Sequence, residues 1–395
     1  MTDVILIINC GSSSLKFAVY PANEHADEAL LTGKVMGIGH QPVLTARMGG
    51  EALAVTEPLN NIPQDASHEW LIEQLLDRLH SEFVSLNPVA AGHRVVHGGS
   101  EFFGPVLTTA NVRRKLEDFV PLAPLHQPHN LAAIDAIDKF APHLPQVACF
   151  DTSFHRTQPR LGQMFALPYA LTDTGIIRYG FHGLSYEYIA AQLPTELGAG
   201  ADGRVIVAHL GNGASMCAMK NRQSVATTMG FTALDGLMMG RRCGSLDPGA
   251  ILHLMQEKGL SVDEVQRILY RESGMLGVSG ISNNMQVLEQ RTEPRAKEAI
   301  DLFCYRAVRE IGSLAAAIGG LDALVFTAGI GENSVVVRQK ICAELGWLGV
   351  ELDIAANASN QNQISAAGAT VDVRVIKTDE ESVIAASSRE VLNSC

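Results

Sequence analysis

The feature that most limits how this chain can fold is a short pattern that occurs twice. Residues 4–14, VILIINCGSSS, form an apolar run that ends in one polar residue and a turn of small residues. Residues 205–215, VIVAHLGNGAS, repeat the pattern with His209 in the place of Asn9, an offset of 200 residues. Each copy is typical of a strand, a tight turn and a second strand. Two copies at a domain-sized offset indicate a duplicated domain, although glycine also occurs in strand turns simply because it tolerates positive φ.

Short apolar runs alternate with longer stretches of helical periodicity along the rest of the chain. Apolar residues recur every three to four positions in residues 70–83 and in residues 296–319, which predicts amphipathic helices. Residues 378–381 match a capping box that would open a last helix. Strands that alternate with helices predict an α/β fold. The predicted strands cover residues 4–8, 89–91, 146–150, 205–208, 321–326 and 371–376.

Composition narrows the class of protein. A length of 395 residues corresponds to two or three domains of about 150 residues each, and a hydrophobic content of 47% can form sizeable cores. The net charge of −12 argues against broad binding to nucleic acid or to an anionic membrane. Seven scattered cysteines without a C-x-x-C pair indicate reduced thiols. Because there is no signal-peptide pattern and no apolar run near the ~20 residues that span a bilayer, we expect a soluble cytoplasmic protein.

Three glycine-rich segments are candidates for binding phosphate. They contain Gly11, Gly211 and Gly329, each close to the end of an apolar run. Backbone N–H groups in such turns approach a phosphate closely, and small side chains leave room for it. None of the segments fits G-x-x-x-x-G-K-[ST] or a complete Rossmann fingerprint. A plain turn is the alternative for any single segment, but three in one chain favour a phosphate-bearing ligand.

Two arginine-containing turns add positive charge. Arg94 stands between His93 and His97 in a segment that ends in a glycine pair, and Arg242 follows Arg241 in a turn bounded by glycines. The forked guanidinium group suits the oxygens of carboxylates and phosphates, and a solvated surface arginine is the alternative for either one. The two valines between the histidines favour extended backbone over a helix, so the H-x-x-x-H spacing does not predict a zinc site.

Two acids and two further histidines complete the candidates. Asp151 follows the predicted strand 146–150, and Glu380 opens the last predicted helix. Carboxylates in such places bind Mg²⁺ directly or through water, and their alternatives are a turn and a helix cap. His126 and His182 lie among glycine or proline, and each alone could equally be structural. Together the phosphate loops, arginines, histidines and acids describe a phosphoryl-transfer site.

Eight segments, in chain order, resemble the motifs of the acetate kinase family. The resemblance covers nearly the whole chain and implies an actin-like (ribonuclease H-like) α/β fold, in which two duplicated domains flank a nucleotide cleft. The first domain would be residues 1–151 together with the C-terminal helix 382–395, and the second would be residues 152–381. The segments are Asn9-x-Gly-Ser-Ser-Ser-x-Lys16, Gly92-His-Arg-Val-Val-His-Gly-Gly99, Pro124-Leu-His126, Phe150-Asp-Thr-x-Phe-His155, Tyr179-Gly-Phe-His-Gly183, His209-Leu-Gly-Asn-Gly213, Gly329-Ile-Gly-Glu-Asn-Ser334 and Thr378-x-Glu-Glu381.

The resemblance also implies an activity. In the family, the γ-phosphoryl group of ATP is transferred reversibly and directly, in line, to acetate, giving acetyl phosphate and ADP. The reaction depends on Mg²⁺, with Mn²⁺ as an alternative, and a homodimer is expected. A carboxylate with a pKa of roughly 4 is already ionised at neutral pH, so no general base is required. We therefore expect Asp151 to organise metal-bound water, while other groups neutralise the two anions and position them.

By position, the resemblance assigns a role to each candidate. Asp151, His182 and Arg242 would be catalytic, with His182 stabilising the transition state. Acetate and acetyl phosphate would contact Arg94, Val96, Leu125, His126, Phe181 and Ala233. The nucleotide would contact His209, Leu210, Gly211, Asn212, Gly213, Asn284, Gln286, Gly329, Ile330, Gly331, Glu332 and Asn333. Asn9 and Glu380 would serve the metal, and Asn9, Ser12 and Lys16 would hold phosphate.

Some positions depart from the family pattern and leave alternatives open. Ala233 stands where a proline usually walls the acyl pocket, which makes propionate an alternative acceptor, although one methylene discriminates by only about 1–3 kcal/mol. Asn284 and Gln286 replace an Asp and an Arg, so GTP or another donor stays an alternative to ATP. Arg241 and Cys243 flank Arg242 in place of Thr and Ser. A non-kinase ATPase of the actin-like fold is the remaining alternative.

Overall fold

The computed structural model describes residues 1–11, 14–23, 28–38, 41–49, 51–52, 62–83, 85–124 and 126–394. Two compact units can be distinguished: unit 1 comprises Met1–Phe154 and Asp379–Cys395, and unit 2 comprises His155–Thr378. The borders predicted from the sequence, at residues 151 and 382, lie close to these divisions. Among the described residues, no helix is both long and apolar enough to cross a lipid bilayer.

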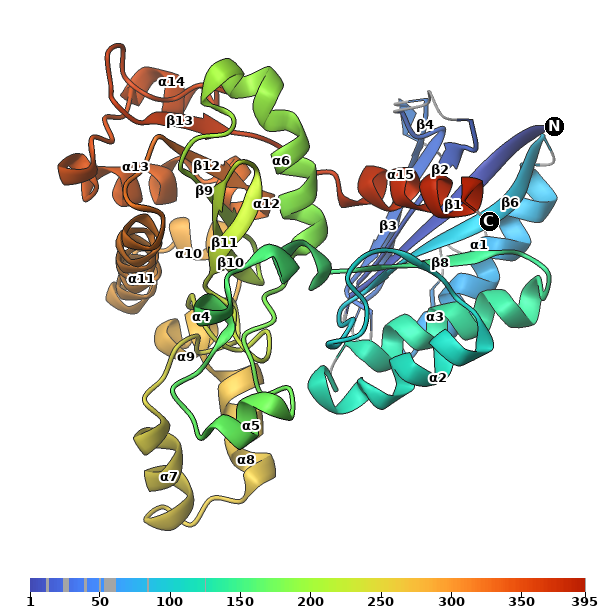
Figure 1. Ribbon diagram of the computed structural model, residues 1–395, viewed down its shortest axis with the longest axis horizontal. Helices are drawn as coiled ribbons and strands as arrows, with labels where there is room; N and C mark the ends of the chain where they lie inside the picture. Colours follow the sequence, from blue (N-terminus) through green and yellow to red (C-terminus); the bar gives the residue numbers. More distant parts are fainter. Residues whose placement is uncertain are drawn as a thin grey trace. The chain divides into compact units, whose positions relative to one another are not determined.

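Unit 1 is built on an eight-stranded sheet with the order β5-β4-β3-β2-β1-β6-β8-β7 (Figure 1). β1 pairs with β2 in the antiparallel sense and with β6 in the parallel sense, and β8 lies parallel to β6. The strands are β1 (Thr2–Cys10), β2 (Ser14–Pro21), β3 (Leu31–Met36), β4 (Val43–Met48), β5 (Glu51–Ala52), β6 (Leu86–Val95), β7 (Val106–Leu107) and β8 (Gln146–Phe150). The helices are α1 (His68–Glu82), α2 (Ala110–Asp118), α3 (Gln127–Phe140) and α15 (Glu380–Asn393).

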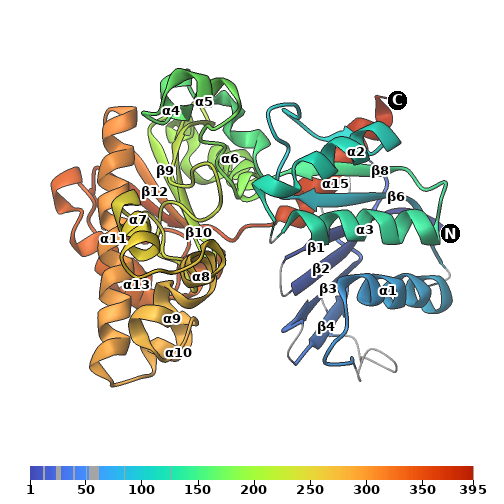
Figure 2. The same ribbon diagram turned by 90° about the horizontal axis from the view of Figure 1, so that it is seen from below.

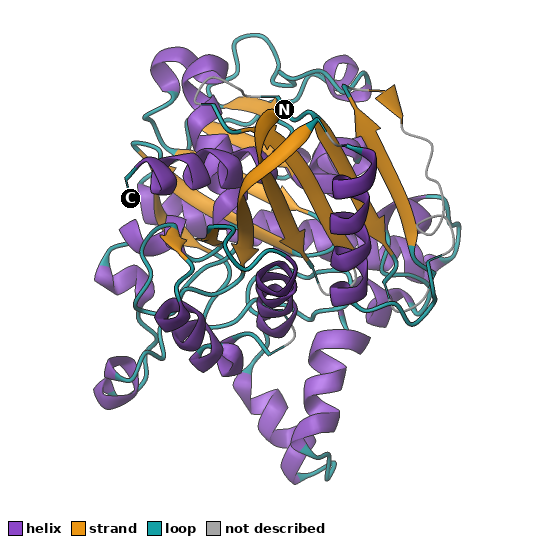
Figure 3. Ribbon diagram, turned by 90° about the vertical axis from the view of Figure 1, so that its right-hand side faces the viewer, coloured by secondary structure: helices purple, strands orange, loops and turns teal. Residues whose placement is uncertain are grey.

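Helices cover the unit 1 sheet because its central strand is apolar on both faces. Val4, Leu6 and Ile8 of β1 join one core with apolar residues of α1 and α3. On the other face, a Cβ at Gly92 of β6 would meet Ile7 of β1 and the side chains of Ile384 and Ser388 in α15. Burial on both faces explains why this strand reads as a continuous apolar run and not as an alternating pattern. Figure 3 shows the sheet and the helices packed against it.

Unit 2 contains a five-stranded sheet with the order β11-β10-β9-β12-β13. Its helix α11 packs against β10 and β11 on one side, and α6 lies on the other side (Figures 1 and 2). The strands are β9 (Val205–Leu210), β10 (Ala214–Lys220), β11 (Gln223–Thr227), β12 (Ala323–Thr327) and β13 (Asp372–Val375). The helices are α4 (Arg160–Gln163), α5 (Tyr169–Asp173), α6 (Gly183–Leu197), α7 (Pro248–Gln256), α8 (Val262–Arg267), α9 (Gly274–Ser279), α10 (Met285–Glu289), α11 (Pro294–Ile318), α12 (Ala328–Asn333), α13 (Val335–Ala343) and α14 (Ile354–Ala358).

The two sheets share one strand order. In unit 1, the antiparallel pair β1–β2 is followed by β6 and β8, both parallel to β1. In unit 2, the antiparallel pair β9–β10 is followed by β12 and β13, both parallel to β9. The repeated sequence pattern therefore marks the equivalent hairpin of each unit. The third glycine-rich segment differs, because it leads from β12 into the short helix α12 and not into a second strand.

The predicted capping box at the last helix is wrong. Asp379, not Thr378, is the N-cap of α15, and its carboxylate accepts a hydrogen bond from the backbone N–H of Ser382. A capping box also needs the acid three residues on to reach back to the cap. Glu381 instead accepts a hydrogen bond from the amide of Asn9. The helix therefore begins with acids that face the end of β1.

Candidate active site

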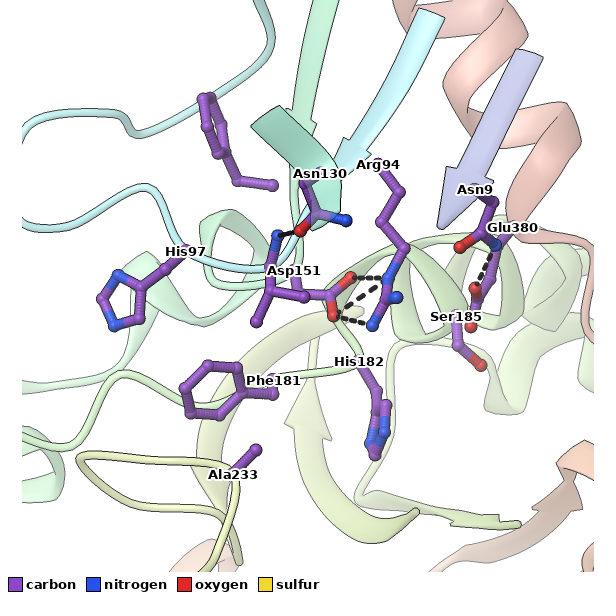
Figure 4. A network of polar contacts seen from close by, with 12 residues as sticks. Asn9, Arg94, His97, Asn130, Asp151, Phe181, His182, Ser185, Ala233 and Glu380 are labelled. Atoms are coloured by element: carbon purple, nitrogen blue, oxygen red, sulfur yellow. Dashed lines mark hydrogen bonds and ion pairs between the residues drawn. The ribbon is translucent and has the colours of Figure 1, made fainter. Parts of the chain in front are cut away.

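Asn9, at the end of β1, contacts both acids in the first turn of α15. Its amide Nδ2 donates to Glu380 Oε2 at 3.1 Å and to Glu381 Oε1 at 2.8 Å (Figure 4). Carboxylates are favoured at this end of a helix, where backbone N–H groups carry partial positive charge. Since the amide nitrogen serves the two acids, the carbonyl oxygen of Asn9 is the atom that this side chain can offer to a ligand. Strand β1 and helix α15, far apart in sequence, thus meet at one oxygen-rich point.

Lys16 supplies positive charge beside the same acids. It lies directly across the β1–β2 hairpin from Asn9, and its Nζ is 3.5 Å from Glu381 Oε1. Desolvation acts to lower the pKa of Lys16, but the charges of Glu381 and Glu380 outweigh it and raise the pKa above its usual value. The side chain of Lys16 remains about half exposed. It is therefore charged and accessible to an anion.

Arg94 and Asp151 form a forked ion pair at the ends of neighbouring parallel strands. Arg94 Nη2 donates to Asp151 Oδ2 at 2.6 Å, and Arg94 Nε donates to Oδ1 at 3.0 Å (Figure 4). The Asp151 side chain is only 2% exposed and that of Arg94 is 15% exposed. Burial opposes the charge of Arg94, but the adjacent carboxylate of Asp151 raises the pKa of the guanidinium above its ordinary value. The pair brings a permanent cation to the β1–β2 turn, where Arg94 Nη1 lies 3.5 Å from the carbonyl oxygen of Cys10.

The first turn of α3 holds these segments in place through two amide side chains. Asn130 donates to the carbonyl oxygen of Cys10 at 3.0 Å and accepts from the backbone N–H of Val96 at 3.0 Å. Gln127 both donates to the backbone oxygen of His97 and accepts from its N–H, each at 3.2 Å. Sequence reasoning singled out His126, the N-cap of α3, and missed these two buried amides. Their spacing of three residues on the buried face of an otherwise apolar helix is the signal that could have found them.

In unit 2, His182 is held by a buried hydrogen-bonded group. It is the N-cap of α6 and adopts a left-handed backbone conformation with φ of 58°, which costs on the order of 1–3 kcal/mol for a residue other than glycine. His182 Nδ1 lies 2.8 Å from Ser215 Oγ, and the imidazole ring stacks on that of His209 with centroids 4.2 Å apart. His209 Nδ1 in turn contacts Ser185 Oγ at 2.8 Å. Phe181, the residue before His182, is fixed as well, because its carbonyl oxygen lies 2.9 Å from His155 Nε2.

Arg242 and His182 face the same point of the β9–β10 turn. A Cβ placed on Gly213 would lie 2.7 Å from Arg242 Nη2 and 3.4 Å from His182 Nε2. Arg242 Nη1 donates to the carbonyl oxygen of Ala233 at 2.5 Å, which links it to the predicted acyl wall. Its turn is rigid because Gly240 N–H donates to the backbone oxygen of Asn212, and a Cβ on Gly240 would lie 1.9 Å from Asn212 Oδ1. The turn that carries Arg242 therefore packs closely against Asn212 of the predicted nucleotide loop.

The predicted nucleotide segment 329–333 forms most of helix α12. Glu332 Oε1 accepts from the backbone N–H groups of Ala328 and Thr378, at 2.9 and 3.2 Å. Arg338, fully buried, donates to the carbonyl oxygens of Gly331 and Glu332 at 2.9 and 3.0 Å. These contacts fix the backbone around the segment, and the Glu332 carboxylate accepts hydrogen bonds from the protein's own backbone.

The remaining predicted residues fall in several places. Asn284 is the N-cap of α10 and accepts from the N–H of Gln286. Both residues are exposed at the surface of unit 2. Val96 and Phe181 are buried, each 2% exposed. Ser12 and Leu125 lie outside the described residues. The structure thus brings Asn9, Lys16, Arg94, Asp151 and Glu380 together in unit 1, and His182, His209, Gly213 and Arg242 together in unit 2.

The donors near Asn9 suit a hard divalent cation. Mg²⁺ prefers oxygen ligands and is commonly held by one or two carboxylates with phosphates and waters completing its shell. Glu380 and the amide oxygen of Asn9 are ligands of that kind. Among the described residues, no group of three or more His, Cys, Asp or Glu side chains forms a metal cage. The residues present therefore fit a metal that arrives with a phosphate-bearing ligand.

Comparison with known proteins gives a consistent result. The chain matches the Acetokinase family over residues 4–386. An acetate kinase from Rhodopseudomonas palustris is 52% identical over 390 residues, which cover 98% of this chain and 97% of that protein. Among solved structures, a propionate kinase from Francisella tularensis has a TM-score of 0.89 at 37% identity, covering 98% of both chains. The acetate kinase of Porphyromonas gingivalis has a TM-score of 0.85 at 36% identity, covering 99% of this chain and all 100% of that one.

These matches confirm the resemblance found in the sequence and the actin-like α/β fold class. The chain belongs to the acetokinase family.

Proposed function

We propose that this protein is an acetate kinase, which transfers the γ-phosphoryl group of ATP reversibly to acetate and gives acetyl phosphate and ADP. Family membership supports a phosphotransferase with a carboxyl group as acceptor. The observation that carries the proposal furthest is the convergence of Arg242 Nη2 and His182 Nε2 over Gly213. A cation and an imidazole nitrogen aimed at one point of a glycine turn suit a phosphoryl group in transfer.

The chemistry needs charge neutralisation more than proton transfer. Acetate is ionised at neutral pH, so its oxygen attacks the γ-phosphorus without a base. The two reacting anions must be brought together in line, and the charge on the equatorial oxygens must be stabilised. In this proposal Arg94 binds the acceptor carboxylate, while Arg242 and His182 bind the transferring group. Asp151 holds Arg94 in its forked orientation, which the ion pair of 2.6 Å supports, and does not act as a base.

Mg²⁺, or Mn²⁺ in its place, would be held by Glu380 and the oxygen of Asn9, with Asp151 ordering a metal-bound water. The metal would neutralise charge on the β- and γ-phosphates. Lys16 adds a further positive charge next to Glu381. The oxygen donors at Asn9 and the acids of α15 support this assignment.

The nucleotide is proposed to lie along residues 209–213 and 329–333, with Asn284 and Gln286 toward the nucleoside. Support comes from the rigid glycine turn beside Arg242 and from the fixed backbone of α12. ATP is proposed as the donor and ADP as its product.

Propionate is the second candidate acceptor. The propionate kinase from Francisella tularensis, at a TM-score of 0.89, supports it. Val96, Phe181 and Ala233, with Leu125, are the proposed acyl-contacting residues, and the small side chain of Ala233 supports room for one more carbon. We also propose that the protein acts in the cytoplasm as a homodimer. Light scattering coupled to size-exclusion chromatography tests the dimer, and a monomer at working concentration would contradict it.

A hydroxylamine trap tests the proposed function. The protein is supplied with ATP, Mg²⁺ and one of acetate, propionate, butyrate or glycerol, and acyl phosphate is captured as the hydroxamate. We expect hydroxamate from acetate at the highest rate, less from propionate and none from glycerol. A higher rate with propionate would make propionate the substrate. Phosphate release without hydroxamate from any acid would favour the ATPase alternative and contradict a kinase.

A further inference from the structure

Two hydroxyl groups connect the inner nitrogen of His182 to the core of unit 2. Ser215 Oγ lies 2.8 Å from His182 Nδ1 and 2.5 Å from the hydroxyl of Tyr186. Ser215 and Tyr186 are both fully buried. We refer to the ordered contacts Tyr186–Ser215–His182 as the hydroxyl relay.

The relay follows from the way α6 meets the β9–β10 hairpin. Tyr186 lies one turn after His182 in α6, and its N–H donates to the carbonyl oxygen of His182. Ser215 is directly across the strand pair from His209, whose ring stacks on His182. His209 is itself held by Ser185 of the same helix turn. The imidazole of His182 is thus fixed in position by the stacked ring and at its Nδ1 by Ser215.

The chemistry of the two hydroxyls sets the direction of the hydrogen bonds. A phenol, with a pKa near 10, is a stronger donor than an aliphatic alcohol. Burial raises the pKa of Tyr186 well above its usual value, so the hydroxyl keeps its proton. Tyr186 therefore donates to Ser215, and the one proton of Ser215 is directed to His182 Nδ1.

A histidine that accepts at Nδ1 carries its proton on Nε2 when the ring is neutral. Nε2 is the nitrogen that faces Gly213 and the guanidinium of Arg242. The opposite tautomer would aim a lone pair at the same point and would repel an anionic oxygen there.

We propose that Tyr186 and Ser215 are positioning residues, which hold neutral His182 as the Nε2–H tautomer so that it donates a hydrogen bond to the transferring phosphoryl group. The role of the Nε2–H donor toward a phosphoryl group rests on the proposed kinase function. The tautomer of His182 itself can be measured without turnover. His182 then acts as a donor without having to take up a proton, and its alignment is complete before the substrate binds.

The first readout is the tautomer of His182. Protein with nitrogen-15 labelled histidine is examined by long-range proton–nitrogen NMR at a pH where the ring is neutral. The signal of His182, one of 13 histidines, is assigned by its loss in His182→Gln. We expect the wild type to show Nε2–H only, and Tyr186→Phe and Ser215→Ala to show a mixture of both tautomers. Wild-type protein with the proton on Nδ1, or variants with an unchanged tautomer, would overturn the proposal.

The second readout separates kcat from KM. Tyr186→Phe is expected to lower kcat about tenfold and Ser215→Ala about 100-fold, with KM for ATP and acetate changed less than about threefold. Ser215→Thr keeps a hydroxyl and should retain most of kcat. A rise in KM at constant kcat, or no rescue by threonine in a protein that folds with wild-type stability, would contradict the relay.

Two matched variants control for the loss of a buried hydroxyl. The hydroxyl of Tyr179 donates to the carbonyl oxygen of Gly175 at 2.9 Å, and Ser388 Oγ donates within α15 at 2.7 Å. Tyr179→Phe and Ser388→Ala should leave kcat and the His182 tautomer as in the wild type. Equal losses in these controls would assign the effect to stability and overturn the relay. If wild-type protein forms no hydroxamate at all, the proposed function fails, and the tautomer spectrum still tests the relay.

Discussion

The two sets of candidate residues are fixed by different kinds of interaction, although the sheets that carry them share one strand order. In unit 1, ion pairs fix the side chains: Arg94 pairs with Asp151, and Lys16 pairs with Glu381. In unit 2, hydroxyl groups hold the rings, with Ser215 on His182. Two sheets with the same strand order thus position two chemically different sets of side chains. One set is suited to neutralising anions and a metal, and the other to presenting hydrogen-bond donors in a fixed orientation.

Removing one arginine from each set tests this difference most strongly. Arg242→Ala and Arg94→Ala should each lower kcat by about 10³-fold or more, because Arg242 is proposed to bind the transferring phosphoryl group and Arg94 the acceptor carboxylate. Arg94→Ala should destabilise the fold more, by about 3–5 kcal/mol, since it leaves the buried carboxylate of Asp151 without its cation. Arg242 donates to the backbone oxygen of Ala233, so its loss should lower the free energy of unfolding less, by about 1–2 kcal/mol. The hydroxamate rate and urea denaturation measure the two effects.

The matched control for Arg94 removes both charges of the pair. Arg94→Met combined with Asp151→Leu should recover most of the lost stability and none of the activity. Near wild-type activity in either alanine variant would refute the assignment of that arginine.

A methyl group placed in each hairpin turn is expected to act unequally. Gly213→Ala brings a Cβ to 2.7 Å from Arg242 Nη2, so it should displace the guanidinium and lower kcat/KM about 100-fold. A Cβ at Gly11 would lie 2.7 Å from the hydroxyl of Ser14, which can rotate away, and at an ordinary contact distance of 3.7 Å from the Ser14 backbone oxygen. We expect less than a tenfold loss there. Equal losses, measured by the same assay, would show that the turn of unit 2 has no special role in holding Arg242.

Removal of a carboxylate from α15 tests whether Glu380 is a ligand of the metal. Glu380→Gln should raise the Mg²⁺ concentration needed for half-maximal rate by about tenfold or more, because an amide oxygen is a weaker ligand than a carboxylate. Glu381→Gln, which removes the charge beside Lys16, is the comparison and should have a smaller effect. The same Mg²⁺ dependence in both variants would contradict the choice of Glu380 as ligand. Chelation of divalent metal should abolish hydroxamate formation in the wild type.

One buried histidine in each unit predicts a smaller, pH-dependent effect on stability. Burial lowers the pKa of His93 in unit 1 and of His155 in unit 2 to about 4, from 6.5. As pH falls below 6.5 the unfolded chain takes up these protons first, so stability is fully present above pH 6.5 and is lost toward pH 4. Each histidine should contribute a slope of about 1.4 kcal/mol per pH unit within that window. Denaturation at several pH values in this range measures how the free energy of unfolding depends on pH. His93→Gln should take up one proton fewer on unfolding than the wild type. An unchanged slope of unfolding free energy against pH would exclude His93 as a source of the pH dependence.

Much of the fold could be predicted from local pattern. The predicted strand 146–150 coincides with β8, and the predicted helix 296–319 is close to α11 (Pro294–Ile318). Apolar runs and helical periodicity are set by burial within one element, so a single sequence records them. The equivalence of the two hairpins was visible for the same reason, because each strand ends in one polar residue and a glycine turn.

The supporting residues of the site could not be predicted in this way. Ser215 lies 33 residues from His182, and Asn130 lies 120 residues from Cys10, so no local spacing relates them. The capping box failed for a related reason, because Glu381 turns to Asn9, a residue 372 positions away. Polar residues that act through tertiary contacts leave little trace in local pattern.

Oxygen-18 labelling of the acceptor tests whether the phosphoryl group passes directly from ATP to acetate. Acetate labelled with oxygen-18 in its carboxylate is incubated with ATP and Mg²⁺, and the products are analysed by phosphorus NMR and mass spectrometry. We expect acetyl phosphate with one labelled oxygen bonded to phosphorus, because the acetate oxygen attacks the γ-phosphorus. Inorganic phosphate whose one new oxygen comes from solvent, with no labelled acetyl phosphate, would contradict direct transfer to acetate.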